Sequence, residues 1–130
     1  MKGPASDVQA WMAKAEEDRL CIRNNLAAAK VPWSVVCFHA QQGAEKYLKA
    51  FLVARAVSPE RTHDLEYLLG ECMRHDPSLA SLLDDCQALS AFAVDSRYPD
   101  VLPDEDEQIG RQAVAMCDRI CDEVRRRFPG

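Results

Sequence analysis

The chain has 130 residues, of which 48% are hydrophobic and 28% are charged, so a single water-soluble domain over residues 1–130 is expected. Its 16 Lys and Arg residues are outnumbered by 21 Asp and Glu residues, which gives a net charge of −5. That balance argues against a protein that binds nucleic acid over its whole surface, although it still allows a local basic patch.

The first two predicted elements are long helices. Ser6, with Gln9 three residues later, has the pattern of a capping box, and apolar residues then recur at a helical spacing as far as Ala29. This helix stops before Pro32. The second helix, over residues 33–56, is apolar nearly all round, which is typical of the buried central helix of a bundle.

Two shorter helices are predicted next. Thr62 is the expected N-cap of the third helix, with Asp64 in its first turn, where a carboxylate interacts favourably with the helix dipole. Asp76 and Pro77 begin the fourth helix, because an N-cap followed by proline is a common helix start. The segment RYPD at residues 97–100 ends this helix, since a residue before proline is pushed towards extended geometry.

The fifth predicted helix begins near Asp104 and Glu107, and its apolar face continues to Phe128. No segment alternates with a period of two over a useful length, so no strand is expected. Short connections between helices favour antiparallel neighbours. The sequence therefore predicts an all-α protein, built as an antiparallel up-and-down bundle of four to five helices.

No stretch without charge is long enough to span a membrane. The longest, residues 31–44, is shorter than the ~18 apolar residues that a membrane helix needs, and it contains His39, Gln41 and Gln42. The chain does not open with a basic segment followed by an apolar one, so no signal peptide is predicted. We expect a cytoplasmic protein that makes no use of a membrane.

Six cysteines fall mostly where the helical patterns place apolar residues: Cys21, Cys37, Cys72, Cys86, Cys117 and Cys121. Free cysteine is a common small core residue, so reduced thiols packed in the core are the main expectation. Cys117 and Cys121 stand four residues apart and would share one helix face, as two metal ligands can. No second ligand pair is evident, and no metal or cofactor is expected.

A stripe of polar residues interrupts the second helix. His39, Gln42, Lys46 and Lys49 follow one another at spacings of three, four and three, with Glu45 beside them. Ammonium groups on a buried helix are costly unless they are paired or face a cleft. Two interpretations follow. The stripe either lines a cleft that binds a phosphate or a nucleotide, or it is a solvated face on which Glu45 and Lys49 pair one turn apart.

Asp18 stands within the apolar stripe of the first helix. A carboxylate there needs a cationic or hydrogen-bonding partner, which Lys46 or Arg97 can supply. The alternative is a boundary residue whose carboxylate reaches water.

Two further candidates lie near helix ends. His63 beside Asp64 fits general acid–base chemistry near neutral pH, or a simple capping turn. Arg97 and Tyr98 follow the fourth helix in a loop, where Arg97 suits a bidentate phosphate contact or a surface ion pair.

Three motifs occur in a particular order, namely CFHAQQGAEKYLKA at residues 37–50, THDL at 62–65 and RYP at 97–99. In this order and at these distances they resemble the HEPN domain, whose name stands for higher eukaryotes and prokaryotes nucleotide-binding. The resemblance extends from Trp11 and Asp18 to the last helix, so it covers nearly the whole chain.

The resemblance implies an antiparallel bundle of about four long helices and a short one, often assembled as a homodimer. Bacterial and archaeal members are commonly encoded beside a minimal nucleotidyltransferase, often as a toxin–antitoxin pair. Some members are metal-independent ribonucleases, and others are thought to bind nucleotides.

The ribonucleases of the family carry an arginine, four to six intervening residues and then a histidine. No histidine follows Arg97 in this chain, and Arg55 precedes His63 by seven intervening residues. The ribonuclease motif is therefore not found. Activation of the 2′-OH of RNA needs a general base, and no good one stands beside Arg97 in the sequence.

The function that we expect is a non-catalytic nucleotide- or RNA-associated binding module of a two-component system. The residues expected to contact the nucleotide or its phosphates are His39, Gln42, Lys46, Lys49, Arg97 and Tyr98. The residues expected to support them are Asp18, Glu45, His63 and Asp64. One alternative is a ribonuclease toxin with a diverged centre that uses Arg97 with His39 or His63, and another is a purely structural dimerisation module.

A homodimer is also expected from the second helix alone. Val35, Phe38, Leu52 and Val53 exceed the apolar surface that one helix seam requires. Such a surplus is usually covered by a partner.

Overall fold

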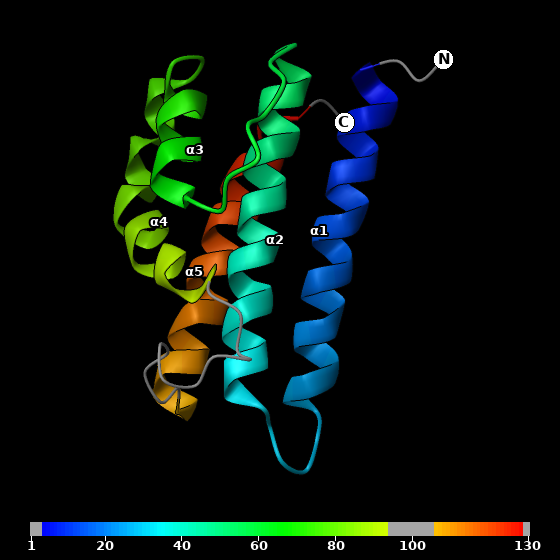
Figure 1. Cartoon of the computed structure of the whole chain (residues 1–130), viewed down its shortest axis with the longest axis vertical. Helices are drawn as coiled ribbons and strands as arrows, with labels where there is room; N and C mark the ends of the chain where they lie inside the picture. Colours follow the sequence, from blue (N-terminus) through cyan, green and yellow to red (C-terminus); the bar gives the residue numbers. More distant parts are fainter. Residues whose placement is uncertain (1–3, 94–105, 129–130) are drawn as a thin grey trace.

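The computed structural model describes residues 4–93 and 106–128, which form an antiparallel bundle of helices (Figure 1). The α-helices are α1 (Pro4–Leu26), α2 (Trp33–Ala54), α3 (Leu65–Met73), α4 (Leu83–Ser90) and α5 (Glu107–Arg125). The 3-10 helices η1 (Pro77–Leu82) and η2 (Ala91–Ala93) flank α4. No strand occurs among the described residues. The predicted all-α up-and-down bundle is confirmed.

Helix α2 is the centre of the bundle. It packs against α1, α3 and α5, and Figure 1 shows it between α1 on one side and α3 and α4 on the other. Most of its side chains are buried, including those of Tyr47, Leu48 and Phe51. Full burial of one leucine or phenylalanine contributes about 1.5–3 kcal/mol. The prediction that the most apolar segment is the buried one is therefore confirmed.

Helix α2 ends two residues before the predicted boundary. Ala56 has a φ of 61°, in the left-handed region, and its N–H donates to the carbonyl of Val53. The N–H of Val57 donates to the carbonyl of Leu52. These two bonds form a Schellman motif, which turns the chain out of the helix without the glycine that usually occupies the left-handed position.

Two predicted helix starts are displaced. Helix α1 begins at Pro4, so Ser6 lies inside its first turn and is not the N-cap; proline is favoured at such a start because it needs no N–H partner. The N-cap of α3 is Asp64 and not Thr62. The Asp64 carboxylate accepts from the N–H of Tyr67 at 3.1 Å, while the Thr62 hydroxyl accepts from the N–H of Asp64.

The later helix starts agree more closely with the prediction. The Asp76 carboxylate accepts from the N–H of Ser78, and Pro77 is the first helical residue. The first turns are 3-10 in geometry, so the fourth predicted helix is divided into η1 and α4. Asp106 caps α5, and the predicted cap Asp104 lies outside the described residues.

The first turn of α5 packs unusually close to the first residue of α2. A Cβ atom at Gly110 would overlap Cε3 of Trp33 and lie 3.0 Å from Cζ3. Only glycine fits at this position in the present packing, because real Cβ atoms do not approach other atoms so closely. Gly110 therefore sets the distance at which α5 meets the start of α2.

The apolar surplus of α2 is smaller than predicted. Leu52 is buried inside the chain and belongs to the core, so it needs no partner to cover it. Val35, Phe38 and Val53 are only half-buried. None of the helices in the described part of the chain is both long and apolar enough to cross a membrane.

Candidate functional site

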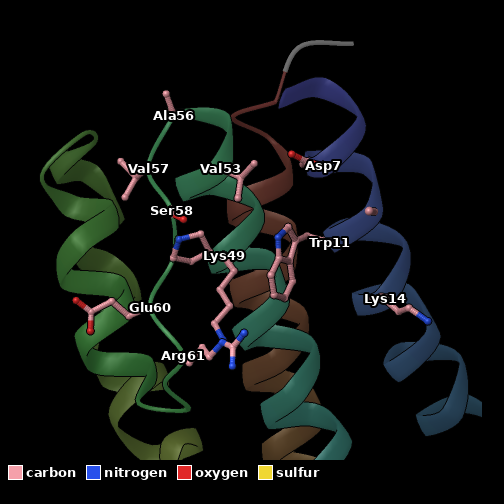
Figure 2. Close-up of a pocket in the computed structure, with 12 residues that line it drawn as sticks. Asp7, Trp11, Lys14, Lys49, Val53, Ala56, Val57, Ser58, Glu60 and Arg61 are labelled. Carbon is pink, nitrogen blue, oxygen red and sulfur yellow. The ribbon is translucent and has the colours of Figure 1, made fainter. Parts of the chain in front are cut away.

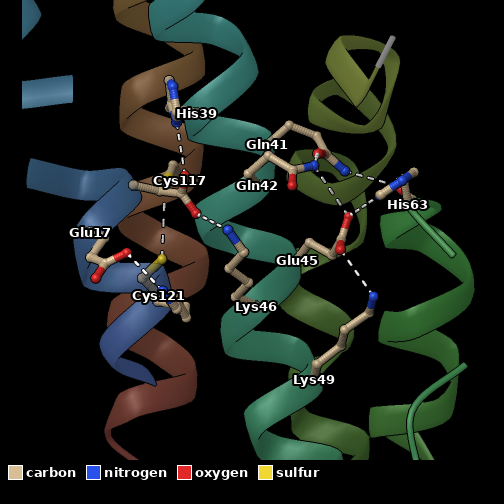
Figure 3. A network of polar contacts seen from close by, with 12 residues as sticks. Glu17, His39, Gln41, Gln42, Glu45, Lys46, Lys49, His63, Cys117 and Cys121 are labelled. Atoms are coloured by element: carbon tan, nitrogen blue, oxygen red, sulfur yellow. Dashed lines mark hydrogen bonds and ion pairs between the residues drawn. The ribbon is translucent and has the colours of Figure 1, made fainter. Parts of the chain in front are cut away.

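Helix α2 carries polar clusters on two different sides, and Figure 3 shows both. The predicted stripe is divided between them, with His39 and Lys46 facing α1 while Gln42 and Lys49 meet Glu45 on the side towards α3. Seven residues are nearly two full helical turns, so His39 and Lys46 share a side. Lys49 is rotated from His39 by about 80°.

Asp18 on α1 is the common acceptor of the first cluster. Its Oδ1 lies 2.8 Å from Nδ1 of His39, and its Oδ2 lies 2.6 Å from Nζ of Lys46. An ionised carboxylate only accepts hydrogen bonds, so Nδ1 of His39 carries a proton. The sequence required a partner for Asp18, and the structure supplies both Lys46 and His39. We call these three residues the Asp18 cluster.

The Asp18 cluster is open to solvent on one side. The side chain of Asp18 is 9% exposed, whereas those of His39 and Lys46 are 26% and 23% exposed. Within residues 4–93 and 106–128, the other ring nitrogen of His39 makes no hydrogen bond, and Lys46 donates only to Asp18. A buried carboxylate thus holds two polar groups at the surface: an ammonium with donors left, and an imidazole whose second nitrogen accepts a hydrogen bond when the ring is neutral and donates one when it is protonated.

Glu45 is the centre of the second cluster, which lies between α2 and the segment before α3. Its carboxylate, 3% exposed as a residue, accepts from Nζ of Lys49 at 3.0 Å and lies 2.7 Å from Nδ1 of His63. The amide of Gln42 lies 3.5 Å from the same carboxylate. The predicted pairing of Glu45 with Lys49 is present, but the pair is buried rather than solvated.

Gln41 belongs to this second cluster and was not identified from the sequence. It is fully buried, its Nε2 donates to the carbonyl of His63 at 2.8 Å, and its Oε1 accepts from Gln42 at 2.7 Å. Its signal in the sequence is an amide among apolar residues at a buried helical position. Such an amide must find partners, and here it fixes the segment before α3 against α2.

The remaining candidates are dispersed. His63 contacts Glu45 and not its neighbour Asp64, which instead caps α3. The adjacent His–Asp pair therefore does not form an acid–base dyad in the structure. Arg97 and Tyr98 lie outside the described residues.

A third polar cluster joins α1, α2 and α5, and no pattern in the sequence indicated it. The hydroxyl of Tyr47 donates to Glu16 at 2.6 Å, and Arg19 bridges Glu16 and Asp118 at 3.1 Å each. Burial, together with the hydrogen bond to Glu16, raises the pKa of Tyr47 to about 12. Burial acts to raise the pKa of Glu16, but the bonds and charges of Tyr47 and Arg19 hold it below the usual value.

The cysteines pack as predicted, in that Cys21 is half-buried, the other five are buried, and none of the six forms a disulfide. The Sγ atoms of Cys117 and Cys121 lie 3.8 Å apart inside the core. Burial raises the pKa of Cys72 and of Cys86 to about 12, so both stay protonated at neutral pH. In the part of the chain that the structure describes, no group of three or more His, Cys, Asp or Glu side chains is arranged to hold a metal ion.

A cleft of about 770 Å³ opens between the first half of α1, the end of α2 and residues 56–61 (Figure 2). Trp11 enters it from α1, Lys49 from α2 and Arg61 from the connecting segment. The Nζ of Lys49 lies 5.5 Å from the centre of the Trp11 ring. Among the predicted site residues that the structure describes, Lys49 alone lines this cleft, so the cleft is distinct from the Asp18 cluster.

The comparisons with known proteins agree with this architecture. The family model of the HEPN domain matches residues 8–127. TT1696 from Thermus thermophilus has a similar fold, with 22% identity, a TM-score of 0.81, and coverage of 93% of this chain and 98% of that chain. ST0689, described as an archaeal HEPN homologue, gives 27% identity, a TM-score of 0.72, and coverage of 96% and 97%. No curated protein matches the chain.

The chain belongs to the HEPN domain family, because the family model matches nearly its whole length. The expected resemblance is thus confirmed, and the helical bundle is the fold that the similar structures share.

Proposed function

We propose that the chain is a non-catalytic binding module for a nucleotide or an RNA. In this proposal it acts with a minimal nucleotidyltransferase partner in a two-component, toxin–antitoxin-like system. Membership of the HEPN family supports the class of function. The observation that supports the ligand is the Asp18 cluster, where Lys46 presents donors and His39 presents its second ring nitrogen at the surface.

The chemistry of the Asp18 cluster suits phosphate oxygens. An ammonium group has three donors, and Lys46 uses one of them on Asp18. Protonation of His39 would give the cluster a net charge of +1, from two cations and one carboxylate. Charge-assisted hydrogen bonds to phosphate contribute about 1.5–3 kcal/mol each. Arg97 and Tyr98 belong to the same proposed site, with Arg97 as its second phosphate contact, whereas Gln42 and Lys49 lie with Glu45 on the other side of α2.

The direct test is calorimetric titration of the full chain with ATP and with a short single-stranded RNA. Arg97→Ala should weaken binding of one of them roughly tenfold to a hundredfold, because it removes one charge-assisted contact. Arg23→Ala, which removes an exposed arginine at the end of α1, is the matched control and should leave the affinity nearly unchanged. No binding of either ligand by the wild type would refute the proposal.

A second candidate function is favoured by the geometry of His39. A buried carboxylate holds Nδ1 at 2.8 Å and directs the other ring nitrogen outward, which is the arrangement that orients a general base. A metal-independent ribonuclease that uses His39 with Arg97 fits this arrangement without the family's usual motif. RNA cleavage in the presence of a chelator, abolished by His39→Ala and retained by Arg23→Ala, would establish it. Absence of cleavage would leave the binding module.

A homodimer is part of the same proposal. Val35 and Phe38 remain half-buried on α2, and Phe38 meets His39 edge-on at 5.6 Å between ring centres. A second copy covering these residues would place its own surface beside the Asp18 cluster. Light scattering at tens of micromolar should give twice the monomer mass, and Phe38→Asp should shift the mass towards the monomer. A monomeric wild type would contradict this assembly.

A further inference from the structure

The cleft around Trp11 has the chemistry of a second ligand site, separate from the Asp18 cluster. Its volume of about 770 Å³ lies in the range of small-molecule sites, roughly 300–1,000 Å³. Its wall is part apolar, from Trp11, Val53 and Val57, and part cationic, from Lys49 and Arg61. Neither the family match nor the proposed function assigns a role to this cleft.

Two side chains that line the cleft, Arg61 and Trp11, have hydrogen-bond donors without an acceptor among the described residues. Arg61 is exposed and makes no ion pair or hydrogen bond within residues 4–93 and 106–128. In the same described residues the indole N–H of Trp11 makes no hydrogen bond. Lys49, by contrast, is compensated by Glu45 at 3.0 Å. Arg61 is therefore the cation with its full charge available to a ligand, and Trp11 offers both a ring face and a donor.

The charge of the lining also differs from that of the whole chain. Three cationic side chains, Lys14, Lys49 and Arg61, stand against two carboxylates, Asp7 and Glu60, which gives a local charge of +1. The complete chain carries −5. A guanidinium group in such a setting prefers a planar or tetrahedral anion that accepts two hydrogen bonds.

Lys49 and Trp11 form the part of the cleft that suits a flat apolar group, beside the cationic part formed by Arg61. The ammonium of Lys49 already lies at a cation–π distance from the indole, so one part of the ring is electrostatically engaged. The remaining ring surface and the valine side chains can pack against a flat apolar group. An anionic group on the same molecule would then reach Arg61.

We propose that the cleft lined by Trp11, Lys49 and Arg61 binds a small organic anion that carries a planar ring, with the ring on Trp11 and the anionic group on Arg61. The two halves of the site recognise the two halves of one molecule. A phosphate without a ring and a ring without a phosphate should each bind more weakly than a molecule that has both. Adenosine monophosphate is a suitable probe, because adenosine and inorganic phosphate are its matched fragments.

The test is calorimetric titration of the full chain with adenosine monophosphate, adenosine and inorganic phosphate. Adenosine monophosphate should bind at least tenfold more tightly than either fragment. Arg61→Ala should weaken its binding about tenfold or more, as the loss of one charged hydrogen bond does. Because Arg61 is exposed, this variant should fold and melt as the wild type does.

Trp11→Leu supplies a second, independent variant, and the indole resonances supply a local readout. The chain has two tryptophans, Trp11 and Trp33. The ¹H–¹⁵N indole signal that is lost in Trp11→Leu should shift when the ligand is added, while the signal of Trp33 should not. The His39→Ala variant should leave the shift of the Trp11 signal unchanged, because His39 belongs to the Asp18 cluster and does not line the cleft.

Three outcomes would overturn the proposal. They are no binding of the probe by the wild type, equal affinity for adenosine monophosphate and inorganic phosphate, and an equal loss of affinity in Arg61→Ala and Arg23→Ala. The last result would show attraction by charge alone, since Arg23 lies on the last turn of α1 and does not line the cleft.

Discussion

The carboxylate of Asp18 and the ammonium of Lys46 lie 2.6 Å apart and join α1 to α2 through a pair that is mostly withdrawn from water. His39, two turns before Lys46 on the same helix, contacts the other oxygen of the same carboxylate. One acidic side chain therefore both links α1 to α2 and orients the proposed ligand contacts.

Loss of Lys46 should destabilise the fold as well as affect binding. In Lys46→Ala the carboxylate of Asp18 remains buried, and among residues 4–93 and 106–128 it keeps His39 alone as a partner. Breaking a buried pair costs about 3–5 kcal/mol. We expect a value at the lower end, because the Lys46 side chain is 23% exposed and water can reach the vacated space. Urea unfolding at pH 7 measures the change.

The double variant Asp18→Asn with Lys46→Ala is the control for this prediction. It removes the uncompensated charge, so it should regain part of the stability that Lys46→Ala loses. Equal stability of the wild type and Lys46→Ala would show that Asp18 does not depend on Lys46.

The helical spacing of apolar residues was sufficient to predict the bundle and the central position of α2. The need of Asp18 for a partner could also be predicted, because a carboxylate among apolar residues is costly. Lys46 was one of the two partners named for Asp18 and is confirmed. The second partner, His39, was not predicted, since it depends on the rotation of α2 against α1. That same rotation divides the polar stripe and buries Lys49 with Glu45.

Contacts that depend on a turn between two helices could not be predicted from the sequence for a different reason. His63 reaches Glu45 because the chain turns sharply at Ala56, whose left-handed conformation has no glycine to signal it. The cleft beside Trp11 depends on the same turn, since residues 56–61 form one of its walls. A resemblance of local motifs contains no information on such a turn.

Gly110→Ala should destabilise the protein by about 1–3 kcal/mol, because the new methyl group overlaps the ring of Trp33 and forces α5 away from α2. Gly70→Ala is a matched control, since a Cβ there meets nothing within 4 Å. In an exposed helix position alanine is favoured over glycine, so Gly70→Ala should stabilise by about 0.5–1 kcal/mol. Thermal melting compares the two, and a tolerated Gly110→Ala would contradict the close packing.

Stability should decrease at alkaline pH because of the buried thiols. Cys72 and Cys86 have pKa values raised to about 12 by burial, against an ordinary value of 9.0. Each thiol stays protonated in the folded state while the unfolded chain ionises. The contribution of each buried thiol to the free energy of unfolding is therefore complete below pH 9. It is lost as the pH rises towards 12, by about 1.4 kcal/mol per pH unit.

Urea midpoints between pH 8 and pH 10 check this expectation. Cys86→Ala should give a shallower decrease with pH than the wild type, whatever its stability at pH 8. Parallel curves for the two proteins would mean that the Cys86 thiol does not contribute.

Tyr47→Phe should reduce stability at neutral pH by about 1 kcal/mol, since it removes the hydrogen bond to Glu16. That bond helps to hold the Glu16 pKa below its ordinary value of 4.5, so its contribution is present above that pH and is lost on further acidification. The difference between variant and wild type should therefore shrink below pH 4. Tyr67→Phe, which removes a hydroxyl on an exposed tyrosine, is the control and should leave stability nearly unchanged.

The central claim is that the Asp18 cluster contacts a nucleotide or an RNA, and the imidazole of His39 reports on it directly. The measurement is an NMR titration of the histidine side chains with a short single-stranded RNA, in the Arg61→Ala variant so that the cleft beside Trp11 does not contribute. The account predicts that the His39 ring signals shift in proportion to bound RNA, while those of the exposed His75 stay in place. His39 signals that remain unchanged at saturating RNA would contradict it.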